Sequence, residues 1–259
     1  MITLKNLNDY LNSLFGEDLV QKARKKDPYL ANGLQLPGKE KIRKVVLGTT
    51  ATEEFLQEAV KAGADSIIVH HSLPLFHAYK LVSPYLYKRL KVLIKNDLSL
   101  FGFHYILDAH PKLGNNAQII QKLGAVRKEP FFDEWGFMAE FKTAQTRELL
   151  SKKLAVLFSH DIFVINGKKD MIKSIGVVSG GGIPHEREIQ EVIDADLDAY
   201  LTGEVKESTV GIFRELGVNY FACGHYATEV FGVQALGLEL KKHFADKLEV
   251  EFLDVPNPL

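Results

Sequence analysis

Short apolar runs rich in β-branched residues alternate with amphipathic stretches along most of this chain. The expected strands are Arg43–Thr49, Ser66–Val69, Leu98–Phe103, Phe137–Phe141, Ile162–Ile165, Ser174–Ser179, Ala199–Thr202 and Tyr220–Cys223. Helices are expected from the N-terminus to Phe15, between Thr50 and Gly63, from Ser83 to about Asn96, at Thr146–Phe158 and Glu186–Ile193, from about Lys206 to Leu216, and after Cys223. Strands that alternate with helices in this way predict a layered α/β/α fold.

The length and composition fit a folded protein with more than one core. The chain has 259 residues, of which 46% are hydrophobic and 25% are charged, so we expect roughly two domains or one large α/β domain. The alternation restarts after Gly124, which favours a second α/β unit.

The charge balance and the absence of targeting signals restrict the partners. The 32 basic and 33 acidic residues give a net charge of -1, so no global field favours a nucleic acid or an anionic membrane. No apolar run has the length of a membrane span, and the N-terminal segment has helical periodicity in place of a signal-peptide core. The single cysteine, Cys223, excludes an internal disulfide framework. We therefore expect a cytoplasmic protein with no membrane or nucleic-acid partner.

Two adjacent histidines stand at the end of an apolar run in the segment Ser66 to Phe76, SIIVHHSLPLF. The carboxyl end of a strand in an open α/β sheet is where ligands bind. Consecutive strand residues point to opposite faces, so His70 and His71 can share one ion only where the backbone turns, or can each serve one ion of a pair. The alternative is a structural histidine pair.

Two further junctions between a strand and a helix carry histidines and carboxylates. His104, Asp108 and His110 follow the strand that ends at Phe103. His110 precedes a proline and can simply occupy a turn, and Asp108 can equally cap one. His225 and Glu229 open the final helix at a four-residue spacing that places both on one face, although the helix dipole alone also favours a carboxylate there.

Together the three junctions offer nitrogen and oxygen ligands without sulfur. Imidazole and carboxylate ligands suit zinc, iron, manganese, nickel or cobalt, and a bridging carboxylate can hold two divalent ions. The residues that carry this interpretation are His70, His71, Asp108, His225 and Glu229, with His104 beside them.

Local patterns give three further expectations. The NGLQ segment, Asn32 to Gln35, is a turn candidate. Thr50 and Glu53 have the spacing of a helix capping box. The SGGG segment, Ser179 to Gly182, can bring backbone amides close to an anion, or can be a flexible turn.

Five segments in this order resemble the Nif-three-like family, whose members also carry the name GTP cyclohydrolase I type 2 homologues. They are SIIVHHSLPLF, LDAHPKLGNNA, SGGG, DAYLTGE (Asp198 to Glu204) and CGHYATE (Cys223 to Glu229). The resemblance implies two interlinked α/β domains with a dinuclear metal site in the cleft between them, and a ring-shaped homohexamer. It implies a metal-binding domain of residues 1–125 and 220–259 and a second domain of residues 126–219.

The resemblance also implies a role for each candidate residue. His71 and Asp108 match ligands of one ion, His70 and His225 match ligands of the other, and Glu229 matches the bridging carboxylate. His104 matches a histidine close to the metals, as a ligand or as a catalytic proton carrier. Many relatives have an aspartate where this chain reads LGTTATEE.

The ligand pattern favours metal-assisted hydrolysis, and the resemblance implies a purine nucleotide such as GTP as the substrate. The alternative is a non-catalytic metal-binding or regulatory protein that forms a hexameric ring, because the same ligands serve both. A nucleic-acid-binding ring is not supported by the charge balance.

Overall fold

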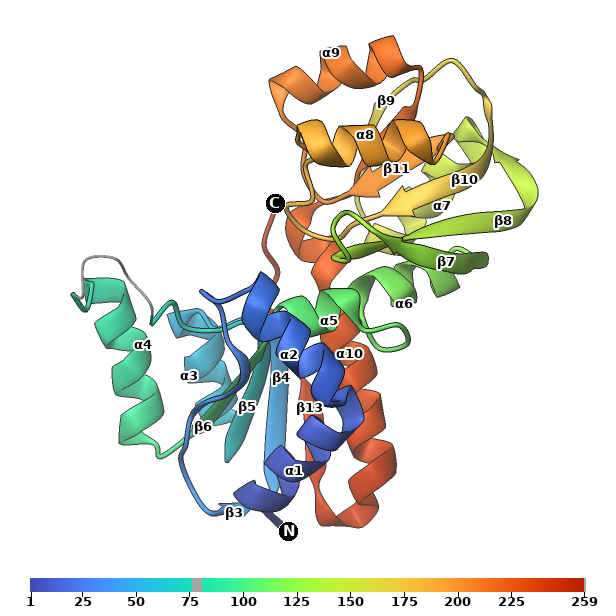
Figure 1. The fold of residues 1–259 in the computed structure, drawn as a ribbon. Coiled ribbons are helices and arrows are strands. Elements are labelled where there is room, and N and C mark those ends of the chain that lie inside the picture. The colour runs from blue at the N-terminus through green and yellow to red at the C-terminus, as the bar shows by residue number, and fades with distance from the viewer. Residues whose placement is uncertain (76–80, 259) are drawn as a thin grey trace. The chain divides into compact units, whose positions relative to one another are not determined.

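The computed structural model describes residues 1–75 and 81–258, so Phe76, the last residue of the SIIVHHSLPLF segment, lies outside the described residues. The chain forms two compact units (Figure 1). Unit 1 comprises Met1–Leu113 and Gly232–Pro256, and unit 2 comprises Gly114–Phe231 with the last residues of the chain. Each unit contains its own sheet and its own helices, as the alternation of strands and helices predicts.

Unit 1 is built on a five-stranded sheet with the strand order β13-β4-β5-β6-β2. The strands are β2 (Asn32–Leu36), β4 (Lys44–Thr50), β5 (Ser66–His71), β6 (Ser99–Phe103) and β13 (Glu249–Phe252). The first four strands in this order are parallel, and β2 is antiparallel to β6. A short antiparallel pair, β1 (Ile2–Thr3) and β3 (Lys41–Ile42), lies apart from this sheet.

Within the described part of the chain, the helices of unit 1 are the four that apolar periodicity predicted and two that it did not, Glu17–Lys26 and Tyr105–Ala109. They are α1 (Leu4–Phe15), α2 (Glu17–Lys26), α3 (Glu53–Lys61), α4 (Pro84–Lys95), α5 (Tyr105–Ala109) and the later part of α10 (His225–Phe244), which is followed by the 3-10 turn η1 (Ala245–Lys247). Helices α3 and α4 pack on one face of the sheet, where Phe55, Leu56 and Leu93 contribute to a buried apolar cluster. Helix α4 begins at Pro84 with Ser83 as its N-cap residue, as predicted.

Two local predictions in unit 1 are wrong. The NGLQ segment is not a turn but most of strand β2, because its backbone pairs with β6, with Leu34 opposite Phe101. The cap of α3 is Thr52, whose Oγ1 accepts a hydrogen bond from the amide of Phe55. Thr50 cannot cap that helix because it still belongs to strand β4.

Unit 2 is built on a six-stranded sheet with the strand order β7-β8-β10-β11-β12-β9. The strands are β7 (Ala125–Phe131), β8 (Gly136–Thr146), β9 (Phe163–Ile165), β10 (Met171–Val177), β11 (Ala199–Thr202) and β12 (Asn219–Ala222). Strands β10, β11 and β12 are parallel, and the remaining pairs are antiparallel. Strand β7 was not predicted, because its residues are largely exposed and do not form an apolar run.

Strand alternation sends the side chains of this sheet to two apolar clusters. Ala199 and Leu201 face a cluster that includes residues of α6 (Asn115–Lys122) and α7 (Arg147–Phe158). Tyr200 faces a second cluster with residues of α8 (Glu186–Asp194) and α9 (Glu207–Leu216). The predicted α/β/α layering is therefore confirmed within unit 2.

In each unit, a buried aspartate accepts hydrogen bonds from two consecutive backbone amides at or next to a parallel strand. In unit 1, the carboxylate of Asp65 accepts hydrogen bonds from the amides of Arg43 and Lys44 at 2.8 and 3.3 Å. In unit 2, the carboxylate of Asp198 accepts hydrogen bonds from the amides of Lys173 and Ser174 at 2.8 and 3.0 Å. In both units, this carboxylate thus helps to fix the register of a pair of parallel strands.

Among the described residues, no helix combines the length and the apolar character that a membrane crossing requires.

We expect the Asp198→Asn substitution to lower the free energy of unfolding by about 2 kcal/mol, because it removes charge-assisted hydrogen bonds to Lys169 and two amides. Burial alone would raise the pKa of Asp198, but the ion pair with Lys169 and the amide donors outweigh burial and hold the pKa below its ordinary value. The ionised carboxylate therefore stabilises the fold above pH 3.8 and loses this effect as the pH falls through the lowered pKa.

Urea unfolding at neutral pH and well below pH 3.8 measures both effects, and the exposed Asp161→Asn serves as the control. A difference between wild type and Asp198→Asn that does not shrink in acid would contradict this assignment.

Candidate metal centre

Two neighbouring histidines end strand β5 of unit 1, and hydrogen bonds to the strands on either side orient them. His70 is fully buried, and its Nδ1 donates a hydrogen bond to the carbonyl oxygen of Phe103, on the β6 side, at 3.0 Å. Nδ1 of His71 lies 3.0 Å from Oγ1 of Thr50, at the end of β4. Each ring thus has its own partner, and the two ring centroids lie 4.6 Å apart. Both bonds leave Nε2 as the nitrogen through which the ring can bind a metal.

His104 immediately precedes α5, and a buried carboxylate holds its ring. Nδ1 of His104 donates a hydrogen bond to Oδ2 of Asp27 at 2.9 Å. The same oxygen accepts hydrogen bonds from the side-chain amide of Asn32 at 3.0 Å and from the backbone amide of Tyr105 at 3.4 Å. Burial would raise the pKa of Asp27, but His104 and the other donors outweigh it and hold this pKa below its ordinary value. Asp27 therefore remains ionised and fixes the ring of His104.

The structure brings four of the predicted residues together in unit 1. His70, His71 and His104 each offer a ring nitrogen, and these atoms lie within 4.8 Å of one another. Oδ2 of Asp108, on α5, lies 3.6 Å from Nε2 of His70. Three imidazoles and a carboxylate in this arrangement can hold a metal ion.

His110 does not join this group. Its Nδ1 accepts hydrogen bonds from the amides of Lys112 and Leu113 at 3.1 and 3.0 Å, and its ring lies edge-on to Phe15. These contacts confirm the alternative that His110 is part of a turn.

Unit 2 supplies the other two predicted ligands from the first turns of α10. Nε2 of His225 lies 3.2 Å from Oε2 of Glu229, four residues further along the helix. Nδ1 of His225 donates a hydrogen bond to Oε1 of Glu204 at 2.6 Å. The hydrogen bond to Glu229 raises the pKa of His225 to about 9 against the opposing effect of burial, and Glu204 raises it further. His225 must release a proton before it can bind a metal through Nε2.

The SGGG loop lies directly against this pair. Gly180 has a φ of +60°, and a Cβ atom at this position would overlap Oε1 of Glu229. The amide of Gly180 donates a hydrogen bond to Oγ1 of Thr228 at 2.8 Å. A glycine is required at position 180 both by its backbone conformation and by the close approach of Glu229.

Three residues that contact the histidines were not predicted. Thr50, Asp27 and Glu204 each lie against the Nδ1 atom of a candidate histidine. Two signals were available: Thr50 and Glu204 follow expected strands, and Glu204 is the last residue of the DAYLTGE segment. Asp27 ends α2 and carried no signal, because an aspartate at a helix end is common in any sequence.

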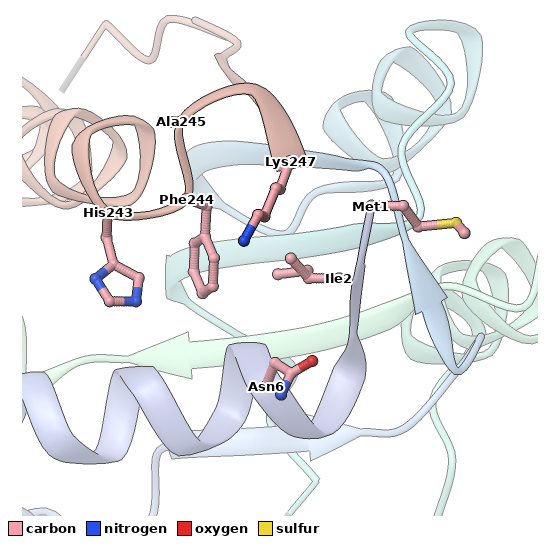
Figure 2. A pocket seen from close by; sticks show the side chains of 7 residues that line it. All are labelled: Met1, Ile2, Asn6, His243, Phe244, Ala245 and Lys247. Atoms are coloured by element: carbon pink, nitrogen blue, oxygen red, sulfur yellow. The ribbon is translucent and has the colours of Figure 1, made fainter.

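A separate pocket of about 630 Å³ in unit 1 contains none of the predicted site residues (Figure 2). Asn6, His243 and Lys247 line it together with apolar side chains at the N-terminus and at the end of α10. Lys247 and His243 are exposed there. The pocket therefore supplies no part of the candidate metal centre.

The histidines and carboxylates of the candidate site have the chemistry of ligands for divalent metal ions. Each of the four imidazoles has its Nδ1 atom engaged by an oxygen atom, which is the arrangement typical of metal-binding histidines. Nε2 of His70 and of His225 also lies beside a carboxylate oxygen. Imidazole nitrogens and carboxylate oxygens are suitable ligands for first-row divalent ions.

Comparison with known proteins gives matches over the full length of the chain. The family model described as Duf34/NIF3 (NGG1p interacting factor 3) matches residues 2–258. A protein of Haemophilus influenzae named GTP cyclohydrolase 1 type 2 homolog is 35% identical over 96% of this chain and 100% of its own length. The protein of the same name from Escherichia coli K12 is 37% identical over 97% of this chain and 99% of its own length.

Solved structures share the fold. The structure of protein ybgI, described as of unknown function, superposes with a TM-score of 0.88 at 32% identity and covers 100% of both chains. The structure of TTHA1606 from Thermus thermophilus gives a TM-score of 0.86 at 29% identity, also over 100% of both chains.

Proposed function

This chain belongs to the Duf34/NIF3 family, and we propose that it is a dinuclear metal-dependent hydrolase that acts on a purine nucleotide such as GTP. The observation that carries the proposal is the common orientation of the four histidines, each held through Nδ1. Nε2 would then be the metal-binding atom in three of them and the proton-carrying atom in His104. The names of the curated relatives support the choice of a nucleotide substrate.

The proposed ligands come from both units of the chain. His71 and Asp108 would hold one ion, His70 and His225 the other, and Glu229 would bridge the two. Zinc, iron, manganese, nickel and cobalt all accept such ligands. When bound, a pair of divalent ions polarises a substrate and lowers the pKa of a coordinated water, which supplies a nucleophile near neutral pH.

His104 is the proposed proton carrier. Asp27 keeps a proton on Nδ1 of this ring, so Nε2 is the atom that can accept a proton or return it. The ionised carboxylate of Asp27 also fixes the direction in which Nε2 points. Removal of a proton from the attacking water and its delivery to the leaving nitrogen of a purine ring are the steps that this residue would serve.

Metal analysis of the purified protein, combined with a screen of nucleotides that follows products by mass, tests the proposed activity. Turnover of a purine nucleotide that depends on the retained metal is the expected result. Retained metal without turnover on any nucleotide would instead favour a non-catalytic metal-binding or regulatory protein.

We expect Glu229→Ala to lower the occupancy of both metal sites, because it removes the proposed bridging carboxylate. His71→Ala should lower the occupancy of one site only. Plasma mass spectrometry of the purified variants measures both effects, and the exposed Glu215→Ala is the matched control. An unchanged metal content in Glu229→Ala would remove the bridging assignment.

We expect His104→Asn to keep its metals and to lose roughly a hundredfold or more in turnover, since asparagine can form hydrogen bonds but cannot carry a proton. If His104 only supports the ligands, the variant should instead lose about 10 to 100-fold in metal affinity. Metal content and the rate on the substrate found by the screen distinguish the two roles. A variant with both metals and the full wild-type rate would make His104 a structural residue.

The family resemblance also leads us to propose a homohexamer, and the near-neutral charge offers little long-range repulsion against self-association. Light scattering at micromolar protein concentration should give six times the 29.1 kDa mass of the chain. A monomer mass would contradict the proposal.

A further inference from the structure

Strand β11 of unit 2 braces the SGGG loop with two polar side chains. The hydroxyl of Tyr200 donates a hydrogen bond to the carbonyl oxygen of Gly182 at 2.5 Å, and the hydroxyl of Thr202 donates one to that of Gly180 at 3.2 Å. Residues at a two-residue spacing lie on the same face of a strand. Glu204 continues this spacing just beyond the end of β11.

The backbone around Glu204 is held against the start of α10. A Cβ atom at Gly203 would lie 2.7 Å from Cα and 2.9 Å from the amide nitrogen of His225, so only glycine permits this approach. The buried hydroxyl of Tyr220 donates a hydrogen bond to the carbonyl oxygen of Glu204 at 2.6 Å. The position of Glu204 relative to His225 is therefore set by the packing of the backbone.

The two carboxylates beside His225 lie at opposite nitrogens of its ring. Glu229 is 3.2 Å from Nε2, and Glu204 is 2.6 Å from Nδ1. Because an imidazole binds a metal through one nitrogen at a time, the carboxylate at Nδ1 is placed to orient the ring and not to join the ligands at Nε2.

We propose that Glu204 is a positioning residue that keeps the proton of His225 on Nδ1 and thereby reserves Nε2 for a divalent metal ion. The proposal rests on the proposed function of His225 as a metal ligand. It also gives a role to the DAYLTGE segment, in which Tyr200 and Thr202 brace the loop beside Glu229 while Glu204 orients the histidine.

Zinc affinity measured against a competing chelator tests this role. We expect Glu204→Leu to weaken zinc binding by about 10 to 100-fold, because the variant keeps the size of the side chain but has no acceptor for the Nδ1 proton. Glu204→Gln should weaken binding less, since its amide oxygen can still accept that proton. Glu215→Leu, an exposed substitution in the same unit, is the matched control and should bind zinc like the wild type.

The unfolding temperature of the metal-free protein separates positioning from a structural role. It should fall only slightly in Glu204→Leu, because the side chain of Glu204 is 44% exposed and solvent weakens its ion pair with His225. Equal zinc affinity in wild type and Glu204→Leu would overturn the proposal, and so would a loss of affinity accompanied by a matching fall in this unfolding temperature.

A wild-type protein that binds no zinc, and none of the other divalent ions, would defeat the proposed function without deciding the role of Glu204. In that case the Nδ1 proton of His225 in nuclear magnetic resonance spectra of the metal-free protein decides it. A hydrogen-bonded proton that is present in wild type and lost in Glu204→Leu supports the orienting contact. Its absence from wild type would refute it.

Discussion

Parallel strand pairing is the constraint on which the candidate site in each unit depends. Strand β5 pairs in parallel with β4 and β6, and β11 pairs in parallel with β10 and β12. Parallel strands end at the same edge of their sheet, so residues from distant segments gather there without any local signal that joins them. The pairing of Thr50 with His71 at the ends of β4 and β5 is the direct result of this geometry.

The aspartates at the opposite edge give the two units a common plan. Asp65 and Asp198 each precede the central parallel strand and bind two amides of the neighbouring segment, just before the residues that pair in parallel with that strand. His71 follows Asp65 by six residues, and Glu204 follows Asp198 by the same number. The sixth residue after the aspartate is therefore a histidine at the end of β5 in unit 1 and a carboxylate just beyond β11 in unit 2. The carboxylate of Glu204 accepts a hydrogen bond from Nδ1 of His225, which follows the neighbouring strand β12.

Orientation of the imidazoles is what changes a group of polar side chains into a candidate metal centre. A carbonyl oxygen, a hydroxyl and two carboxylates each occupy one Nδ1 atom. A buried polar group without a partner costs free energy, and these bonds remove that cost while they fix the direction of each ring. Close approaches at Gly180 and Gly203 have the same effect on the backbone, because a side chain at either position would displace Glu229 or the start of α10.

The sequence by itself determined the alternation of strands and helices, the starts of α4 and α7 at Ser83 and Thr146, and the location of His70 and His71 at a strand end. These features follow from local periodicity and capping, which act over a few residues. Only the tertiary structure decided that the NGLQ segment pairs as a strand, because edge pairing with β6 overrides its local turn preference.

The partners of the histidines were likewise beyond the sequence. Asp27 lies 77 residues from His104 along the chain, and Glu204 lies 21 residues from His225. In a single sequence, an aspartate at a helix end or a glutamate after a strand has the same pattern as an ordinary cap or a surface charge. Which carboxylate meets which ring nitrogen is set by strand order and by backbone approach, and these are properties of the folded chain alone.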